Sequence, residues 1–388
     1  TPQRKAVNGK DLMTYADIYK TKSGTLNELR QLRASHAKKV DDDSATQLVT
    51  QGRNADSCRA TFKSHQHVTT VFNRSKLFEL IQEINLEKLI TDGRRRELAD
   101  YERLYASPSE RVAADLADGY ENQLGDLAAY MPNMSKVIND IIAPELAVNN
   151  FKTQRGFLIQ PLLLVGPAGC GKSYLASALS GLMNTPTLEL KAETQQSSAS
   201  LCGGAKHWSN AQAGALFNLV SKTTVSNGII FIDEVDKTRG AGDYPFINAL
   251  YALLEPTTAS KFSDNACPDI TLDLSQLSWI FTANTAEGIP QPLLSRLNVV
   301  ELSALTKSEA RNVAHAIFSK QCELYLGHNS GLEISASALD VLQLESPRKQ
   351  TLMLRTGIGK VLLEKGRQLN SAHLPRASKD SAPRIGFI

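Results

Sequence analysis

Apolar and polar positions follow two different patterns along the 388-residue chain. In the first 130 residues, apolar side chains recur at helical spacing, as in the segments 77–90 and 94–105. The segment SPSE at 107–110 is typical of a helix start, because proline suits the first helical position and an acid suits the first turn. Residues 1–130 are therefore predicted to be an all-α region, with the polar stretch 38–60 open between loop and solvated helix.

Short apolar runs replace this helical pattern from residue 131 onward. Helical segments separate five of these runs, which are QPLLLVG at 160–166, TPTLELKAE at 185–193, GIIFIDE at 228–234, LSWIFTAN at 277–284 and LNVVELSAL at 297–305. Strands that alternate with helices are typical of an α/β domain with a parallel sheet. We therefore predict an α/β domain over 131–302 with a parallel five-stranded sheet.

Helical spacing returns after residue 302. The segment TKSE at 306–309 is a capping box, a second helix is expected after Ser335, and a third helix over about 348–369. These helices predict a small helical domain over 303–370. The tail 371–388 is rich in Ser, Pro and basic residues, and we expect it to extend over the surface.

Composition narrows the class of protein but not its chemistry. Hydrophobic residues make up 42% of the chain and charged residues 21%, which is ordinary for a soluble globular protein. The net charge of +3, from 43 basic and 40 acidic residues, is too balanced to indicate a dedicated nucleic-acid binder. The first hundred residues lean basic, and a solvated helix face would have the same composition.

Cysteine spacing and apolar run length bear on location. The five cysteines lack metal-ligand spacing, so we expect neither a zinc site nor a disulfide framework, but reduced thiols in a cytoplasmic protein. No apolar run is long enough to span a bilayer, so no membrane contact is expected. No secretory signal is visible, but the chain begins at Thr1 rather than Met, which leaves targeting by a missing N-terminus open. The cysteines are Cys58, Cys170, Cys202, Cys267 and Cys322.

The segment GPAGCGKS at 166–173 carries the clearest chemical signal. It has the spacing G-x-x-x-x-G-K-[ST], follows an apolar run and precedes a helix-compatible segment. In that context the backbone N–H groups and the helix N-terminus hold phosphates, Lys172 reaches the β- and γ-phosphates, and Ser173 ligates Mg²⁺. The residues predicted to contact the nucleotide here are Gly166, Pro167, Ala168, Gly169, Cys170, Gly171, Lys172, Ser173 and Tyr174.

An acidic pair completes this pattern. Asp233 and Glu234 directly follow the apolar run GIIFI, downstream of the phosphate loop. We expect Asp233 to hold the Mg²⁺ shell through water, and Glu234 to polarise a water for attack on the γ-phosphate. A single aspartate at a strand end could also be a helix cap, but an acidic pair in this position indicates hydrolysis. The sequence therefore predicts ATP and Mg²⁺ as cofactors and an ATPase as the enzyme.

With these motifs the chain resembles the AAA+ ATPases, most closely the ATPase module of the Lon protease, over about residues 131–370. The resemblance includes FTANTAEGIPQPLLSRLNVVEL at 281–302, which is similar to that family's stretch from sensor 1 to the arginine finger. It implies that Asn284 helps to orient the attacking water and that Arg296 enters the neighbouring subunit's site. A short polar side chain and a guanidinium suit these tasks, although Arg296 could also be a solvated arginine at a helix end.

The resemblance also implies a sensor 2 arginine and an oligomer. Arg348 begins the last predicted lid helix and would reach back to the nucleotide, with Arg355 two turns on as the competing candidate. The family assembles into rings, so a homo-oligomer, and a hexameric ring in particular, is expected. Lon-like proteases carry a peptidase domain after the lid, and here the lid and tail use up the residues after Arg296, so we expect a non-proteolytic protein.

An isolated tryptophan marks a candidate pore loop. The segment LCGGAKHWSNAQAG at 201–214 lies between a predicted strand and a predicted helix, where AAA+ unfoldases present an aromatic residue to a polypeptide in a central pore. Trp208 stands at that position, and its indole offers a large contact area at low entropic cost. Lys206 and His207 would bias the pore toward acidic or polar segments. The alternative is that Trp208 packs in a core or a subunit interface.

The match to this loop is incomplete. Ser209 and Asn210 follow the tryptophan where the family has an apolar residue and a glycine, which weakens the case for processive threading. The polar segment TTASKFSDN at 257–265 is a candidate for a second pore-facing loop.

Three functions fit these observations. The leading one is an ATP-hydrolysing ring motor that remodels or unfolds proteins through a central pore, as chaperones do, with residues 1–130 recruiting a protein substrate or adaptor. The second is a nucleic-acid-handling AAA+ ATPase of the loader or branch-migration type, for which no helix-turn-helix or zinc finger is apparent. The third is a nucleotide-switched assembly scaffold.

Overall fold

The computed structural model describes residues 67–375, except residues 88, 152, 196, 209, 239–245 and 328–330. The chain divides into two compact units, Thr1–Lys63 and Ser64–Ile388, and all the described residues belong to the second unit. The helices predicted for residues 1–66, the stretch 38–60, Cys58 and the tail from residue 376 lie outside the described residues.

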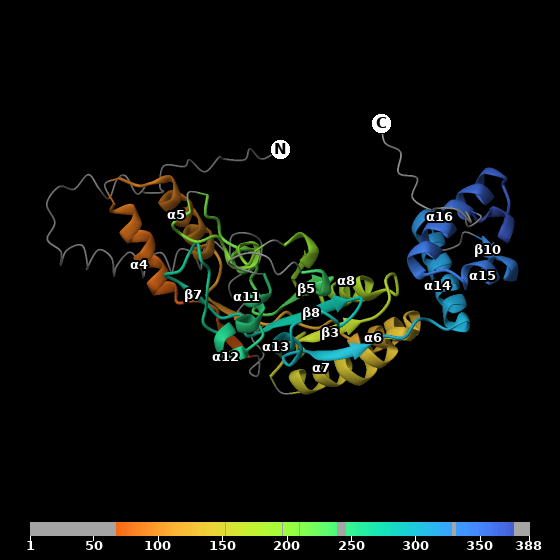
Figure 1. Cartoon of the computed structure of the whole chain (residues 1–388), viewed down its shortest axis with the longest axis horizontal. Helices are drawn as coiled ribbons and strands as arrows, with labels where there is room; N and C mark the ends of the chain where they lie inside the picture. Colours follow the sequence, from red (N-terminus) through yellow and green to blue (C-terminus); the bar gives the residue numbers. More distant parts are fainter. Residues whose placement is uncertain are drawn as a thin grey trace, which may run out of the picture. The chain divides into compact units, whose positions relative to one another are not determined.

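A parallel sheet of five strands forms the centre of the α/β domain (Figure 1). All neighbouring strands pair in parallel in the order β4-β5-β8-β3-β9, which confirms the predicted parallel five-stranded sheet. The carboxyl ends of three strands meet at one edge, because Val165 is in register with both Ala283 and Glu301. The strands are β3 (Leu162–Val165), β4 (Thr187–Lys191), β5 (Gly228–Asp233), β8 (Leu277–Ala283) and β9 (Asn298–Glu301).

Alternate residues of the central strands enter two different cores. Leu163 and Val165 face one core, while Leu162 and Leu164 face the other, as the period-2 geometry of a strand requires. Strands covered on both faces read as continuous apolar runs, which is why β3 and β8 are buried at every position. The longer covering helices are α6 (Tyr120–Tyr130), α7 (Ala143–Asn150), α8 (Lys172–Met183), α10 (Ala215–Lys222) and α11 (Phe246–Leu253).

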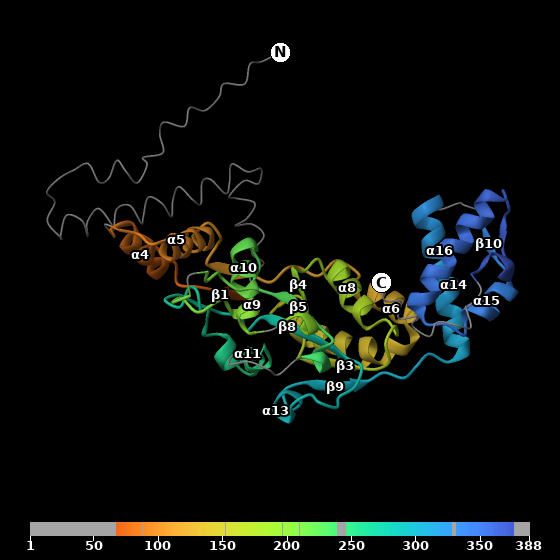
Figure 2. The same ribbon diagram turned by 45° about the horizontal axis from the view of Figure 1, so that its top comes forward.

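Two helices that precede the sheet in sequence share its core. Helices α4 (Arg74–Asn85) and α5 (Asp92–Tyr105) lie side by side in both views, next to α10 (Figure 2). Leu77 and Tyr101 from these helices belong to the same buried cluster as Leu163. The domain boundary at residue 130 therefore stays a prediction, and the core runs across it.

The helix start predicted at 107–110 is wrong. Glu110–Val112 form strand β2, which pairs antiparallel with β1 (Val68–Thr70), and Arg111 is buried there. This pairing and burial override the local capping signal, so the region before residue 131 is mixed rather than purely helical. Other short helices and strands of this region are α9 (Ala199–Cys202), α12 (Pro256–Ala259), β6 (Phe262–Ser263), β7 (Thr271–Leu272) and α13 (Gln291–Leu294).

The described residues of the lid form three helices, which have a core of their own. Helix α14 begins with the predicted capping box, in which the Thr306 side chain accepts from the Glu309 backbone and the Glu309 side chain accepts from the Thr306 backbone. The tail predicted from residue 371 begins instead with a 3₁₀ turn, and Leu374 is buried against the lid. The lid elements are α14 (Lys307–Leu326), β10 (Glu333–Ile334), α15 (Ala336–Leu342), α16 (Pro347–Leu363) and β11 (Gln368–Leu369). In the described part of the chain, we find no helix with the length and apolar character needed to cross a membrane.

Candidate active site

The loop between β3 and α8 has the backbone of a phosphate cradle. Gly169 and Gly171 have φ of +78° and +101°, a region that side-chain-bearing residues rarely adopt. A Cβ on Gly171 would also come within 3.0 Å of the Met131 Cε. Helix α8 begins directly after Gly171, so the unpaired N–H groups of its first turn face the loop. Backbone groups in this arrangement suit an anion.

Lys172 joins this loop to the neighbouring strand. Its side chain is 7% exposed, and its Nζ donates to the carbonyl oxygens of Gly166 and Pro167 at 2.6 and 3.1 Å. Nζ also donates to the Asn284 Oδ1 at 3.2 Å. The structure therefore brings the predicted lysine of the loop and the predicted sensor 1 asparagine together, although 112 positions separate them.

Ser173 and Asp233 form the pair predicted to hold Mg²⁺. The Ser173 hydroxyl lies 3.3 Å from both carboxylate oxygens of Asp233. Hydroxyl and carboxylate oxygens are the hard ligands that Mg²⁺ prefers in proteins, so these residues fit the ion. Thr282, a fully buried residue of β8, donates a hydrogen bond to Asp233 and accepts one from the Glu234 backbone N–H. Thr282 thus holds the acidic pair, although no motif in the sequence indicated this residue.

Glu234 occupies a constrained position at the end of β5. Its backbone φ of 57° and ψ of 48° lie in the left-handed region, which is costly for a residue with a side chain and recurs at functional sites. Its carboxylate pairs with the Lys237 ammonium at 2.8 Å. This hydrogen bond from Lys237 lowers the pKa of Glu234 despite partial desolvation, so the group is a carboxylate at neutral pH. A carboxylate is the form that a general base requires.

These residues surround one cavity of about 580 Å³. Of the predicted residues, those that line it are Ala168, Gly169, Cys170, Gly171, Lys172, Ser173, Tyr174, Asp233, Glu234, Asn284 and Arg348. Gly166 and Pro167 contribute through their bonds to Lys172. Arg348 lies close to the phosphate loop, since a Cβ on Gly169 would stand 3.9 Å from the Arg348 Cβ. Arg355 is exposed and does not line the cavity.

The far end of the cavity is aromatic and apolar. The rings of Tyr130 and Tyr174 have centroids 5.7 Å apart, and the Lys320 ammonium of α14 donates to the Tyr174 hydroxyl at 2.7 Å. Burial, with the neighbouring Tyr174, raises the pKa of Tyr130 to about 12, so its hydroxyl keeps its proton. A flat apolar end with a few polar groups suits a purine base. No local motif in the sequence indicated Tyr130 or Lys320, because both lie at ordinary positions in helices.

Arg296 does not reach this cavity within its own chain. It follows α13, its side chain is exposed, and its guanidinium donates to the Pro292 carbonyl oxygen at 2.7 Å. The guanidinium carbon also lies 5.7 Å from the centre of the Tyr251 ring. Among the residues predicted to act on ATP, Arg296 is therefore the one that the structure leaves apart from the others.

Trp208 is a surface residue of this chain. Its side chain is 41% exposed, whereas the chain's other tryptophan, Trp279, is 2% exposed inside the sheet. Packing of Trp208 in its own core is therefore not supported. His207 is also exposed and meets the indole edge-on, with ring centroids 6.1 Å apart.

Two predictions about the candidate pore loops, one for Lys206 and one for the segment 257–265, differ from the structure. The Lys206 ammonium is bound to the carboxylates of Glu97 and Asp269 at 2.7 and 2.9 Å, so its charge is already compensated within the chain. The segment 257–265 is not simply a polar loop, because it contains the end of α12 and strand β6, and its Asp264 is fully buried. Pairing of β6 with β7 gives this segment a structure that its polar composition did not indicate.

Comparison with known proteins identifies a family over the sheet region. Residues 162–304 match the model of the ATPase family associated with various cellular activities (AAA). The chain is 31% identical over 193 residues to Lon protease 1 of Bdellovibrio bacteriovorus, which covers 49% of this chain and 24% of that protein. It is 32% identical over 163 residues to the Lon protease of Malacoplasma penetrans, covering 42% of this chain and 20% of that protein. The chain thus spans between a fifth and a quarter of the length of these relatives.

Solved structures with a similar fold include the Thermotoga maritima RuvB Holliday junction branch migration motor. The sequence identity is 15% and the TM-score 0.41, over 60% of this chain and 64% of that one.

Proposed function

Because residues 162–304 form an AAA ATPase domain, we propose that this chain binds ATP with Mg²⁺ and hydrolyses it to ADP and phosphate. The observation that carries this proposal is the convergence of Lys172, Asp233 and Asn284, each following or ending a different strand, on one cavity of about 580 Å³. Ligands of open α/β sheets bind outside the carboxyl ends of the strands, which is where these residues meet.

The phosphates lie along the loop. The N–H groups of the loop and of the first turn of α8 hold the β- and γ-phosphates, and the Lys172 ammonium neutralises part of their charge. Ser173 and Asp233 would hold Mg²⁺, which would further compensate the charge on the phosphate oxygens. The purine base occupies the aromatic end between Tyr130 and the lid helix α14. Arg348 contacts the phosphates from the lid.

Hydrolysis needs a positioned water. Glu234 accepts a proton from this water as its oxygen bonds to the γ-phosphorus, and the bond from that phosphorus to the bridging oxygen breaks to release ADP. Asn284 orients the water, since its backbone N–H is fixed by Asp236 and its side chain by Lys172. The hydrogen bond from Lys237 lowers the pKa of Glu234, so this group is a carboxylate, the form that accepts a proton, at neutral pH.

Arg296 acts on a neighbouring subunit. Its distance from its own cavity and its exposed side chain support a role in trans, where a guanidinium stabilises charge on the transferred phosphoryl group. Such an arrangement requires a homo-oligomer with one active site per interface, and a closed hexameric ring satisfies this requirement.

The work of the motor is the remodelling of proteins. Trp208 supports this, because an exposed indole on a surface loop can contact any peptide regardless of its sequence. The relatives that align with the chain are named Lon protease, and proteases act on polypeptides. The region 1–130 recruits the substrate or an adaptor in this proposal, and the lid spans 303–370.

ATPase stimulation tests this assignment of substrate. The rate is measured alone, with a permanently unfolded protein, and with single- and double-stranded DNA. We expect the unfolded protein to stimulate hydrolysis and the DNA to leave it unchanged. Stimulation by DNA alone would reassign the chain to the nucleic-acid-handling ATPases. The Glu234→Gln variant, which retains ATP, then serves to trap and identify the bound substrate.

A further inference from the structure

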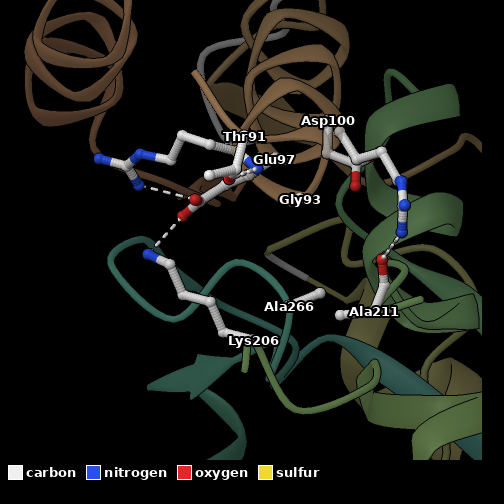
Figure 3. Close-up of a pocket in the computed structure, with 9 residues that line it drawn as sticks. Thr91, Gly93, Glu97, Asp100, Lys206, Ala211 and Ala266 are labelled. Carbon is white, nitrogen blue, oxygen red and sulfur yellow. Dashed lines mark hydrogen bonds and ion pairs between the residues drawn. The ribbon is translucent and has the colours of Figure 1, made fainter. Parts of the chain in front are cut away.

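Helix α5 carries a buried carboxylate that points at the candidate pore loop. Glu97 is 4% exposed, and its two oxygens accept from three donors. One of these donors, the Lys206 ammonium, is drawn beside Glu97 in Figure 3. The Tyr101 hydroxyl lies at 3.1 Å, the Arg94 guanidinium at 2.6 Å and the Lys206 ammonium at 2.7 Å. A buried carboxylate needs such partners, because it would otherwise lose its hydration without compensation. Glu97 therefore fixes the place of Lys206.

Lys206 is held from a second direction as well. Its ammonium lies 2.9 Å from a carboxylate oxygen of Asp269. Partial burial works to lower the pKa of Lys206, but the hydrogen bonds to Glu97 and Asp269 raise it above its ordinary value. The lysine is thus a permanent cation between two carboxylates, two positions before Trp208.

The other flank of the loop also contacts α5. The Arg96 guanidinium donates to the Ala211 carbonyl oxygen at 3.4 Å (Figure 3). The Ala211 N–H donates to the Trp208 carbonyl oxygen at 3.1 Å, and the Trp208 N–H donates to the Ala205 carbonyl oxygen at 2.8 Å. Trp208 therefore lies on a turn whose two sides, at Lys206 and at Ala211, both meet the same helix.

The base of the loop is fastened separately. Asp264 accepts from the Gly214 N–H at 2.8 Å, and it packs so closely on Gly203 that a Cβ there would lie 2.0 Å from its Oδ1. Both ends of the loop 203–214 are thus fixed at one buried carboxylate. The base does not depend on Lys206, so the contacts with α5 act on the part of the loop that carries the tryptophan.

We propose that Glu97 is a positioning residue which, through Lys206, sets where Trp208 stands on the surface. This inference deepens the proposed function and rests on it, since it concerns the residue proposed to grip polypeptide. It gives Lys206 a task within the chain, in place of contact with the substrate. It also means that α5 supports the loop, so a force that a bound polypeptide exerts on Trp208 would be transmitted to this helix.

Tryptophan fluorescence tests this positioning without any substrate. Trp279 is shielded, so collisional quenching by neutral acrylamide reports chiefly on Trp208. We expect Glu97→Gln and Lys206→Met each to raise the quenching constant by about twofold, because a released loop samples more open conformations. Glu87→Gln is the matched control, since Glu87 binds the same Arg94 but not Lys206. Lys206→Arg, which keeps the charge, should stay near the wild-type value.

The outcomes separate this inference from the proposed function. Quenching of Glu97→Gln and Lys206→Met equal to that of Glu87→Gln would overturn the positioning role, whether or not Trp208 grips a substrate. A raised quenching constant combined with unchanged stimulation in Trp208→Ala would keep the positioning role and reject the grip. If Glu97→Gln does not fold, Asp269→Asn probes the same lysine from its exposed side. The double variant of Glu97 and Lys206 should be no more quenched than the stronger single variant.

Discussion

The nucleotide cavity and the loop 203–214 are held in place in different ways. Around the cavity, Asp233 ends strand β5 and Asn284 directly follows strand β8. Lys172 begins helix α8 after the loop that follows β3, so the sheet sets the positions of all three residues. The loop carries Trp208 on a turn, and its support comes from α5 through contacts such as that between Arg96 and Ala211, which are 115 positions apart. Strand ends give the precision that chemistry needs, whereas a supported loop can yield to a substrate.

The largest expected effect on ATP hydrolysis concerns Arg296, which does not line the cavity of its own chain. Arg296→Ala should reduce hydrolysis by roughly 10³-fold or more, the scale of arginine fingers, with ATP affinity little changed. Mixing this variant with Glu234→Gln should restore part of the rate, because some interfaces then pair an intact base with an intact finger. Steady-state ATPase assays across protein concentration give the measurement. Full activity of a monomer at low concentration would contradict the role in trans.

Two substitutions separate binding from chemistry inside the cavity. Glu234→Gln should keep ATP binding and lose about 10² to 10⁴-fold in hydrolysis, because it removes the base that acts on water. Lys172→Ala should abolish tight binding, because Lys172 contacts phosphate in the ground state. Titration with a fluorescent ATP analogue and single-turnover hydrolysis distinguish the two. Equal nucleotide affinity in wild type and in Lys172→Ala would show that the site is assigned incorrectly.

The contribution of Asp264, at the base of the loop 203–214, to the stability of the fold should depend on pH. Burial raises the pKa of Asp264 to about 6, even though the N–H groups of Gly214 and Ala266 work to lower it. The folded state then binds the proton more tightly than the unfolded state, whose aspartate has a pKa near 3.9, so this stabilising contribution is present below about pH 4 and is lost as the pH rises through about 6.

The free energy of unfolding measures this contribution. The value for wild type minus that for Asp264→Asn should fall by on the order of 2–3 kcal/mol between pH 4 and pH 7. Denaturant titrations of both proteins at each pH give the difference, in which groups common to the two proteins cancel. A difference in unfolding free energy that stays constant with pH would mean that the fold does not raise the pKa of Asp264.

The smallest effect distinguishes two arginines of helix α16. Arg348→Ala should weaken ATP binding by about tenfold, since one charge-assisted hydrogen bond is lost, whereas Arg355→Ala should bind as wild type does. Arg355 is the matched control, because it is exposed on the same helix and does not line the cavity. The reverse result would transfer the sensor 2 role to Arg355.

Most of the α/β domain could be predicted from the sequence, because its signals are local. Five apolar runs gave five parallel strands, and the acidic pair lines one cavity together with residues 168–173 of the phosphate loop. The failures share a cause, which is tertiary contact. In place of a helix that starts at 107–110, residues Glu110–Val112 form strand β2 because β1 is available to pair with it. In the segment 257–265, strand β6 forms because it pairs with β7.

Residues that act through distant partners left no local signal. In the sequence, Thr282 is an ordinary residue of a buried strand. Its hydrogen bond to Asp233 depends on the register of β8 against β5. Glu97 reads as an ordinary charge on an amphipathic helix, and only the fold shows that it is buried against Lys206. Tyr130 and Lys320 form part of the cavity only once the lid helix α14 lies beside it.

The central claim is that the cavity hydrolyses ATP while the loop 203–214 contacts the substrate. The variant Trp208→Ala tests this claim most directly. Basal and substrate-stimulated ATP hydrolysis are measured together with the melting temperature of the variant. We expect basal hydrolysis and melting temperature close to wild type, with loss of stimulation by unfolded protein and partial recovery in Trp208→Phe, which keeps a flat apolar face. A destabilisation of about 3–5 kcal/mol, the cost of truncating a core tryptophan, with basal hydrolysis falling alongside it, would contradict the account and make Trp208 a packing residue.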